Sequence, residues 1–96
     1  MKKQPCVYIL SNRYRGTLYV GVTTSIVHRT WQHRTGRIPG FTSRYHLRQL
    51  VYYEFLATVT EAIKREKRLK RWRREWKIAL IESVNPGWKD LWREIV

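Results

Sequence analysis

The sequence is poor in cysteine and in acidic residues, and it has no long apolar run. Its single cysteine, Cys6, cannot form a disulfide within the chain and has no partner at the spacing of a zinc site, which suggests a reducing compartment. The residues from Met1 to Pro5 lead into a strand pattern without an apolar stretch of signal length. We therefore expect no targeting or transmembrane segment and a cytoplasmic protein. Repeats and linkers are also absent, so the 96 residues predict one domain spanning 1–96.

Charge is strongly unbalanced along the chain. Twenty Lys and Arg stand against seven Asp and Glu, which gives a net charge of +13, and 14% of the residues are aromatic. This composition is typical of proteins that bind a nucleic-acid backbone, because each neutralised phosphate releases condensed counterions. The alternative is a basic protein that its charge merely keeps soluble. No segment combines a clean apolar face with a uniformly basic one, which argues against a membrane-surface protein.

A β-hairpin is predicted near the N-terminus. Two β-branched runs, from Cys6 to Leu10 and from Leu18 to Thr23, flank a glycine-containing turn. We expect Tyr8 to pair across from Tyr19. The flanking pairs are then Val7 with Val20 and Ile9 with Leu18. This register places the four aliphatic side chains on one face of the hairpin and both phenols side by side on the other.

Helices and one further strand are predicted for the rest of the chain. Expected in order are a helix from about Ile26 to Thr35 capped by Thr24 or Ser25, a loop from Arg37 to His46, a strand from Leu50 to Phe55, a helix from the capping box Thr58/Glu61 to about Arg73, a helix from Glu75 to Ser83 and a short helix from Lys89 to Ile95. The expected fold class is α/β (α+β), with a three-stranded antiparallel sheet packed against helices.

Glu66 is a carboxylate in the apolar stripe of its predicted helix. At 100° per residue it falls between Ala62 and Leu69 on one side and Ile63 on the other. A carboxylate on a buried face is costly unless it is paired or binds a cation. Two interpretations stay open here, an ion pair with a neighbouring arginine and a metal site.

Basic residues cluster between Lys64 and Lys77, where nine of fourteen residues are Lys or Arg. This segment and the predicted loop before the third strand are the candidate nucleic-acid contacts. The candidates are Arg37, Arg44, Lys67, Arg68, Lys70, Arg71 and Arg74. Trp72 and Trp76 lie one helical turn apart, and we expect core packing rather than base stacking from them. Tyr45 is interpreted as structural, although its place in the basic loop would also allow substrate contact.

Two tripeptides carry a family resemblance. Val7-Tyr8-Ile9 and Tyr19-Val20-Gly21 stand where members of the GIY-YIG nuclease family carry Gly-Ile-Tyr and Tyr-Ile-Gly. Further matching positions are Arg29, His33, Glu66 and Asn85, the last within an Asn-Pro-Gly-Trp ending. The resemblance covers almost all of the chain and is greatest to small, stand-alone members.

The resemblance implies a DNA endonuclease that hydrolyses phosphodiester bonds with one divalent metal, in DNA repair, recombination or processing. DNA is the implied partner, RNA is an alternative, and no membrane is involved. The implied roles are Tyr19 as general base or water-positioning group, Tyr8 as its orienting neighbour, Arg29 on the scissile phosphate, His33 on the nucleophile or phosphate, Glu66 as ligand of Mg²⁺ or Mn²⁺, and Asn85 as a supporting hydrogen-bonding group. The chain has no second acid at matching spacing, so a two-metal carboxylate site is not expected.

Side-chain chemistry fits these roles, with some open alternatives. Arg29 and His33 are four residues apart and project from one side of the predicted helix beside Ile26. A guanidinium stays ionised and binds phosphate oxygens bidentately. Arg29 alone could equally be a solvated charge, but its position ten residues after Tyr19 favours a site. Asn85 could simply form an ordinary helix-ending turn with the following proline.

Two other classes of function remain as alternatives. A catalytically inactive nucleic-acid-binding module would keep the fold and the basic surface, and it would have no need of Glu66 on a buried face. A small subunit that docks a partner protein would need an exposed apolar patch around Trp88 and Trp92. The basic helix serves the nuclease and the binding module equally, so the proposed site discriminates between them.

Overall fold

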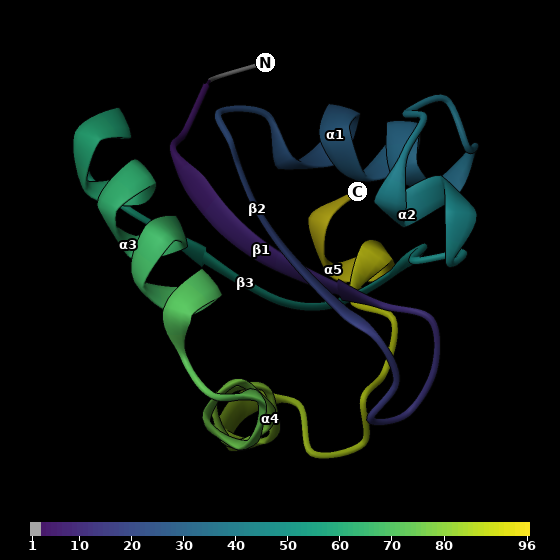
Figure 1. Cartoon of the computed structure of the whole chain (residues 1–96). Helices are drawn as coiled ribbons and strands as arrows, with labels where there is room; N and C mark the ends of the chain where they lie inside the picture. The colour runs from purple at the N-terminus through teal and green to yellow at the C-terminus, as the bar shows by residue number, and fades with distance from the viewer. Residues whose placement is uncertain (1–2) are drawn as a thin grey trace.

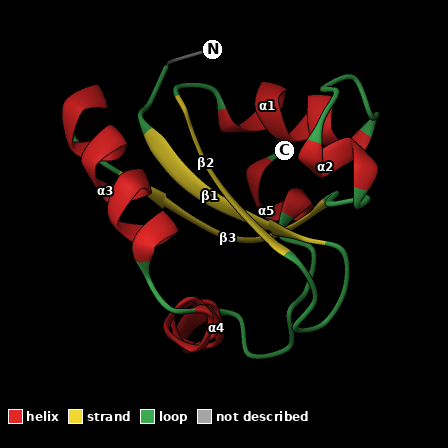
Figure 2. Ribbon diagram, in the orientation of Figure 1, coloured by secondary structure: helices red, strands yellow, loops and turns green. Residues whose placement is uncertain are grey.

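The computed structural model describes residues 3–96 and contains a three-stranded antiparallel sheet with helices on both faces (Figures 1 and 2). The elements are β1 (Cys6–Ser11), β2 (Leu18–Thr23), α1 (Ile26–Arg34), α2 (Phe41–Arg44), β3 (Gln49–Phe55), α3 (Val59–Arg71), α4 (Arg74–Val84) and α5 (Trp92–Ile95). The strand order is β2-β1-β3, so β1 is central and pairs with β2 on one side and with β3 on the other. The predicted fold class is confirmed.

The two faces of the sheet have separate cores. α3 and α4 lie to one side of the sheet, and α1, α2 and α5 lie to the other (Figure 1). The aliphatic face buries Val7, Ile9, Val20, Val51, Tyr52, Ala62, Leu69, Ile81 and Trp88. The tyrosine face buries Cys6, Tyr8, Leu10, Ile26, Leu47 and Leu50. Along β1 the separation arises because successive residues of a strand point to opposite faces. In β3 a register shift opposite Ile9 and Leu10 interrupts this alternation, and the successive residues Val51 and Tyr52 belong to the same core.

The hairpin register differs from the expected one by two residues. Tyr8 stands opposite Gly21, and Tyr19 stands opposite Leu10. The flanking pairs are Val7 with Val22, Ile9 with Val20 and Ser11 with Leu18. A shift of two residues leaves each side chain on its expected face, because the side-chain period of a strand is two. The predicted pairing was therefore wrong, although both tyrosines share one face as expected.

Gly21 and the turn explain this register. A methyl group on Gly21 would lie 2.4 Å from Cζ of Tyr8, so only glycine lets the Tyr8 ring lie across β2. The turn is closed by Asn12, whose Oδ1 accepts a hydrogen bond of 3.1 Å from the backbone N–H of Thr17. The Tyr8 and Tyr19 rings remain neighbours on the diagonal, with centroids 6.4 Å apart.

The bounds of α1, β3 and α4 agree with the predictions to within one residue, and three larger differences remain. The predicted loop from Arg37 to His46 contains the one-turn helix α2, which begins after Gly40 at φ 110°. α3 ends at Arg71 rather than Arg73, after beginning at the predicted Thr58 cap. α5 begins at Trp92 rather than Lys89, because Asp90 instead accepts hydrogen bonds from the N–H groups of Leu50 and Trp92. Across residues 3–96, no helix combines the length and apolarity needed to cross a membrane.

Candidate active site

A chain of hydrogen bonds connects three elements on the tyrosine face. The hydroxyl of Tyr8 on β1 lies 3.0 Å from Nε2 of His33 on α1. Nδ1 of the same imidazole lies 3.2 Å from Oγ1 of Thr42 on α2. All three side chains are buried. Both nitrogens of His33 are thus occupied, and the imidazole fixes the position of the Tyr8 phenol.

Burial keeps this chain uncharged at neutral pH. Burial, together with the nearby Arg29 guanidinium, lowers the pKa of His33 to about 4. Burial also raises the pKa of Tyr8 to about 12, and Arg29 offsets part of that rise. A neutral imidazole donates through one nitrogen and accepts through the other. The hydrogen bonds therefore run either from Tyr8 through His33 to Thr42 or in the reverse direction.

Tyr19 and Arg29 form the accessible rim of this buried chain. The Tyr19 ring is half-buried, with its centroid 5.8 Å from that of His33. Arg29 is also half-buried, its guanidinium lies near enough to Tyr8 and His33 to influence the pKa of both, and it donates a 3.4 Å hydrogen bond to Gln32 of its own helix. The structure therefore brings four of the predicted site residues together: Tyr8, Tyr19, Arg29 and His33.

Glu66 lies on the other face of the sheet. It is 14% exposed, and its Oε1 is 3.2 Å from Nζ of the half-exposed Lys70. No hydrogen bond or ion pair within residues 3–96 joins it to the tyrosines, Arg29 or His33. α3 packs against the aliphatic face through Ala62 and Leu69. The carboxylate is thus at the margin of the core, as its position in the apolar stripe predicts.

The orientation of α3 directs Glu66 toward the free edge of β2. Arg65 and Glu66 flank the buried stripe of α3 on opposite sides, because each residue advances 100° around a helix. Arg65 reaches toward β3, where its Nε donates a 2.6 Å hydrogen bond to Glu54. Glu66 therefore faces away from β3, on the side of the edge strand β2.

The donor set around Glu66 suits a cation that takes most of its ligands from elsewhere. Residues 3–96 hold no group of three His, Cys, Asp or Glu side chains suited to a metal. Lys70 is half-exposed, and an i,i+4 ion pair on a helix contributes only about 0.3–0.5 kcal/mol, so Lys70 can be displaced at little cost. One carboxylate with substrate phosphate oxygens and waters is an ordinary arrangement for Mg²⁺.

Asn85 is buried away from the tyrosines. Its Nδ2 donates to the carbonyl of Val51 at 3.0 Å and to that of Lys89 at 2.9 Å, and its Oδ1 accepts from the N–H of Lys89 at 3.0 Å. These bonds hold the C-terminal segment against β3. The same segment carries Asp90, which forms an ion pair with Arg34 at the end of α1. Asn85 is placed to support α1 indirectly, and its role in the site stays a prediction.

The candidate nucleic-acid contacts separate into distinct locations. A groove of about 420 Å³ along α3 is lined by Lys64, Lys67, Arg68 and Arg71, which we call the α3 groove. Arg74 instead donates to the carbonyls of Arg15 and Gly16 in the hairpin turn. The guanidinium of Arg37 lies 5.0 Å from the Trp31 ring centroid, and that of Arg44 lies 5.6 Å from the Tyr45 ring centroid. Arg74 therefore has a structural bond that the clustering of charge did not predict.

Two contributors to the site, Phe41 and Thr42, were missed in the sequence, and Gly21 was named only as part of a tripeptide, without its contact to Tyr8. Gly21 admits the Tyr8 ring, Thr42 binds His33, and the Phe41 ring stacks on Tyr19 with centroids 6.5 Å apart. Gly21 had a signal, since an isolated glycine inside a strand pattern often marks a close approach. Phe41 and Thr42 had none, because α2 is too short to show a period.

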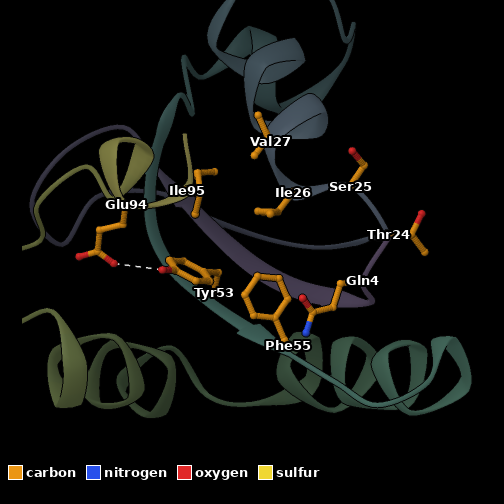
Figure 3. A pocket seen from close by; sticks show the side chains of 9 residues that line it. All are labelled: Gln4, Thr24, Ser25, Ile26, Val27, Tyr53, Phe55, Glu94 and Ile95. Atoms are coloured by element: carbon orange, nitrogen blue, oxygen red, sulfur yellow. Dashed lines mark hydrogen bonds between the residues drawn. The ribbon is translucent and has the colours of Figure 1, made fainter. Parts of the chain in front are cut away.

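A second hollow of about 280 Å³ lies outside this cluster (Figure 3). The start of α1, the end of β3 and α5 contribute side chains to it, and the Tyr53 hydroxyl donates a 3.0 Å hydrogen bond to Glu94 there. Tyr8, Tyr19, Arg29, His33 and Glu66 do not line it. The hollow is therefore separate from the candidate active site.

Comparison with known proteins places the chain in a family. The model of the GIY-YIG catalytic domain matches residues 4–79, which include every predicted site residue except Asn85. The UPF0213 protein of Bacillus pumilus is 35% identical over 69 residues, covering 72% of this chain and 70% of that protein. A UPF0213 protein of Staphylococcus saprophyticus is 38% identical over 68 residues (71% and 83%), and one of Oceanobacillus iheyensis is 34% identical over 82 residues (85% and 94%). No solved structure matches significantly. The chain belongs to the GIY-YIG family.

Proposed function

We propose that the protein is an endonuclease that hydrolyses phosphodiester bonds of DNA with one divalent metal ion held by Glu66. The proposal rests on the grouping of Tyr19 and Arg29 around a buried, neutral Tyr8–His33 pair, in a chain of the GIY-YIG family. The buried part of this group is neutral, and its charged member, Arg29, lies at the accessible rim. A phosphate can therefore contact Arg29 and Tyr19 without a second buried charge having to be desolvated.

Tyr19 is the group that accepts a proton from the attacking water or holds that water in line. Tyr8 is less suited, because its buried phenol with a pKa of about 12 remains protonated and is already bonded to His33. His33 has both nitrogens engaged and acts by fixing Tyr8 rather than by contacting the phosphate. Since a free phenol titrates near pH 10, proton transfer at neutral pH needs a nearby cation, and Arg29 supplies one.

Arg29 also offsets the negative charge that develops on the phosphate in the transition state. A divalent metal at Glu66 would add Lewis-acid stabilisation of the phosphate and leaving oxygens. In this proposal the scissile phosphate lies at Tyr19 and Arg29, and Glu66 would hold the metal ion.

Nicking of supercoiled plasmid in Mg²⁺ or Mn²⁺ tests this proposal. We expect Tyr19→Phe, Arg29→Ala and Glu66→Ala each to lower the rate by about 100-fold or more, because each removes a group that acts in the transition state. Matched controls at exposed positions are Tyr14→Phe, Arg93→Ala and Glu75→Ala, and these should cut like the parent. A parent that cuts no substrate under either metal, while still binding DNA, would instead support the inactive binding module.

Glu66→Ala also separates a metal ligand from a structural ion pair. Its partner Lys70 is half-exposed, so we expect the free energy of unfolding to change by no more than about 1 kcal/mol. Binding of Mn²⁺ to the complex with DNA, followed by calorimetry, should be lost. A drop in stability of roughly 3 kcal/mol or more would indicate a structural carboxylate.

DNA binding is proposed to involve the α3 groove. Because phosphate contacts dominate, affinity should fall steeply with salt and depend little on sequence. Replacing Lys67, Arg68 and Arg71 with Glu should weaken binding to all sequences alike and reduce the salt dependence. The single change Arg93→Glu serves as a control elsewhere on the surface. Unchanged affinity of the triple variant would place the DNA on the segment from Arg37 to Arg48.

A further inference from the structure

Two aromatic side chains of the α2 region are exposed next to the candidate active site. Phe41 is 49% exposed and Tyr45 is 42% exposed, and their ring centroids lie 4.8 Å apart. We call this pair the aromatic platform. It lines a hollow of about 590 Å³ together with Pro39, Gly40, Ser43 and Arg44.

The platform is continuous with the catalytic candidates. The Phe41 ring stacks on Tyr19 at an interplanar angle of 29°, and Tyr19 in turn neighbours His33. A series of rings thus leads from the buried histidine through Tyr19 to solvent. Arg44 is the charged residue lining the hollow, and its guanidinium lies 5.6 Å from the Tyr45 ring centroid. This end of the series is therefore both aromatic and cationic.

The exposure of these rings has a structural cause. Thr42, between them in the chain, is buried and bonded to His33, and its carbonyl accepts a 2.9 Å hydrogen bond from the N–H of Leu47. Because Thr42 anchors its side of the one-turn helix α2 to the protein, Phe41 and Tyr45 point outward. The platform is thus held in place by the same histidine that fixes Tyr8.

We propose that the aromatic platform stacks on one unpaired base beside the phosphate at Tyr19 and Arg29, so that the substrate is single-stranded or locally unpaired DNA. Every base offers a π-face to an aromatic ring, but inside an intact duplex both faces are already stacked. The cation of Arg44 and the net charge of +13 favour a polyanion over a protein partner at this surface. This inference rests on the proposed function for the place of the scissile phosphate.

Binding without metal tests stacking independently of cleavage. The probes are single strands of about 12 nucleotides, intact or with one abasic site moved along the strand, and the matching duplex. We expect the parent to prefer the single strand and to lose about 5- to 100-fold in affinity when the abasic site occupies one particular position. Phe41→Leu should bind the intact strand more weakly by a similar factor and should no longer distinguish the abasic strands.

The hairpin turn offers a matched control. Tyr14 is 62% exposed, and the guanidinium of Arg15 lies 5.4 Å from its ring centroid, which repeats the aromatic and cationic pairing of the platform. Tyr14→Leu should leave affinity and the abasic profile unchanged. Thermal melting verifies that each variant folds, and Tyr45→Leu provides a second test of the platform.

Several outcomes would overturn the inference. A flat abasic profile for the parent would exclude base stacking, even if Phe41→Leu failed to fold, and would leave a protein partner as the occupant. Equal losses in Tyr14→Leu and Phe41→Leu would show a nonspecific effect of exposed rings. If binding depended on the abasic site but no DNA were cleaved, the platform would be supported and the nuclease proposal rejected. If DNA were cleaved but affinity did not depend on the abasic site, the nuclease proposal would stand and the platform would be rejected.

Discussion

The two faces of the sheet show how one strand can contribute both to an apolar core and to the candidate active site. On the aliphatic face, Val7 and Ile9 of β1 pack against the long helices α3 and α4 in an apolar core. On the tyrosine face, Tyr8 from the same strand enters a polar chain with His33 and Thr42. Short elements, α2 and α5, cover much of this second face. The period of two along β1 keeps the two tasks apart.

This difference predicts how the faces respond to change. A substitution on the aliphatic face removes packing and should lower stability without altering the site. A substitution on the tyrosine face moves the rings of the site relative to one another. It should therefore lower nicking strongly even where it changes the free energy of unfolding little. Three experiments test that division, in order of the expected size of the effect.

Leu69→Ala should have the largest effect on stability. Leu69 is fully buried between α3 and the sheet, and such a truncation leaves a cavity that costs about 2–5 kcal/mol in the free energy of unfolding. Urea unfolding would measure it, with the exposed Ile63→Ala on the same helix as the control, expected within about 1 kcal/mol of the parent. DNA affinity at low temperature should be retained. Loss of affinity in a folded Leu69→Ala protein would contradict the separation of the faces.

Acid should destabilise the tyrosine face through His33. Its pKa is about 4 in the folded protein against an ordinary 6.5, so the unfolded chain binds the proton more tightly. The stability that comes from burying a neutral imidazole is therefore complete above pH 6.5 and is lost as the pH falls toward 4, by about 3 kcal/mol. Urea unfolding across this range should show a steeper dependence for the parent than for His33→Gln. The exposed His28→Gln should follow the parent, and parallel curves for all three would refute the buried neutral state.

Gly21→Ala should have a smaller effect on stability and a large one on the site. The added methyl group would meet Cζ of Tyr8 at 2.4 Å, and the buried Tyr8 ring can yield only by leaving His33. We expect a loss of about 1–3 kcal/mol in stability together with loss of nicking. In a Tyr8→Leu background the same methyl group should cost less, as a double-mutant cycle would show.

A glycine in open surroundings provides the control for this change. The nearest atom to a methyl group on Gly87 would be Cγ of Lys89 at 3.8 Å, an ordinary contact. Gly87→Ala should therefore leave stability and nicking close to those of the parent. If Gly21→Ala were equally harmless, the close approach of Tyr8 to β2 would not constrain the site.

Sequence periodicity predicted the faces well and the pairing poorly. Alternation placed Val7, Ile9 and Val20 together and the tyrosines opposite, as observed. It could not distinguish registers that differ by two residues, because both keep every side chain on its face. The choice between them depended on the fit of Tyr8 over Gly21 and on the turn closed by Asn12.

Helical periodicity predicted where a side chain lies on its helix but not which group it contacts. It placed Glu66 at the margin of the buried stripe of α3, where the structure has it. The ion pair that had been considered as an alternative for Glu66 is formed, but with Lys70 one turn along the same helix and not with an arginine. Clustering of charge likewise could not show that Arg74 bonds the hairpin turn. Which charge meets which group depends on the packing of α3 and α4 against distant segments.

By itself, the sequence determined the types of most elements, the faces of the sheet and the excess of positive charge, because propensity and periodicity act over a few neighbouring residues. Tertiary structure alone decided which side chains meet: Tyr8 and His33 are 25 residues apart, and His33 and Thr42 are nine apart. The anchoring of α2 and the exposure of its rings follow from those contacts. A short polar turn has no period of its own, so its conformation is set by the histidine and the strands against which it packs.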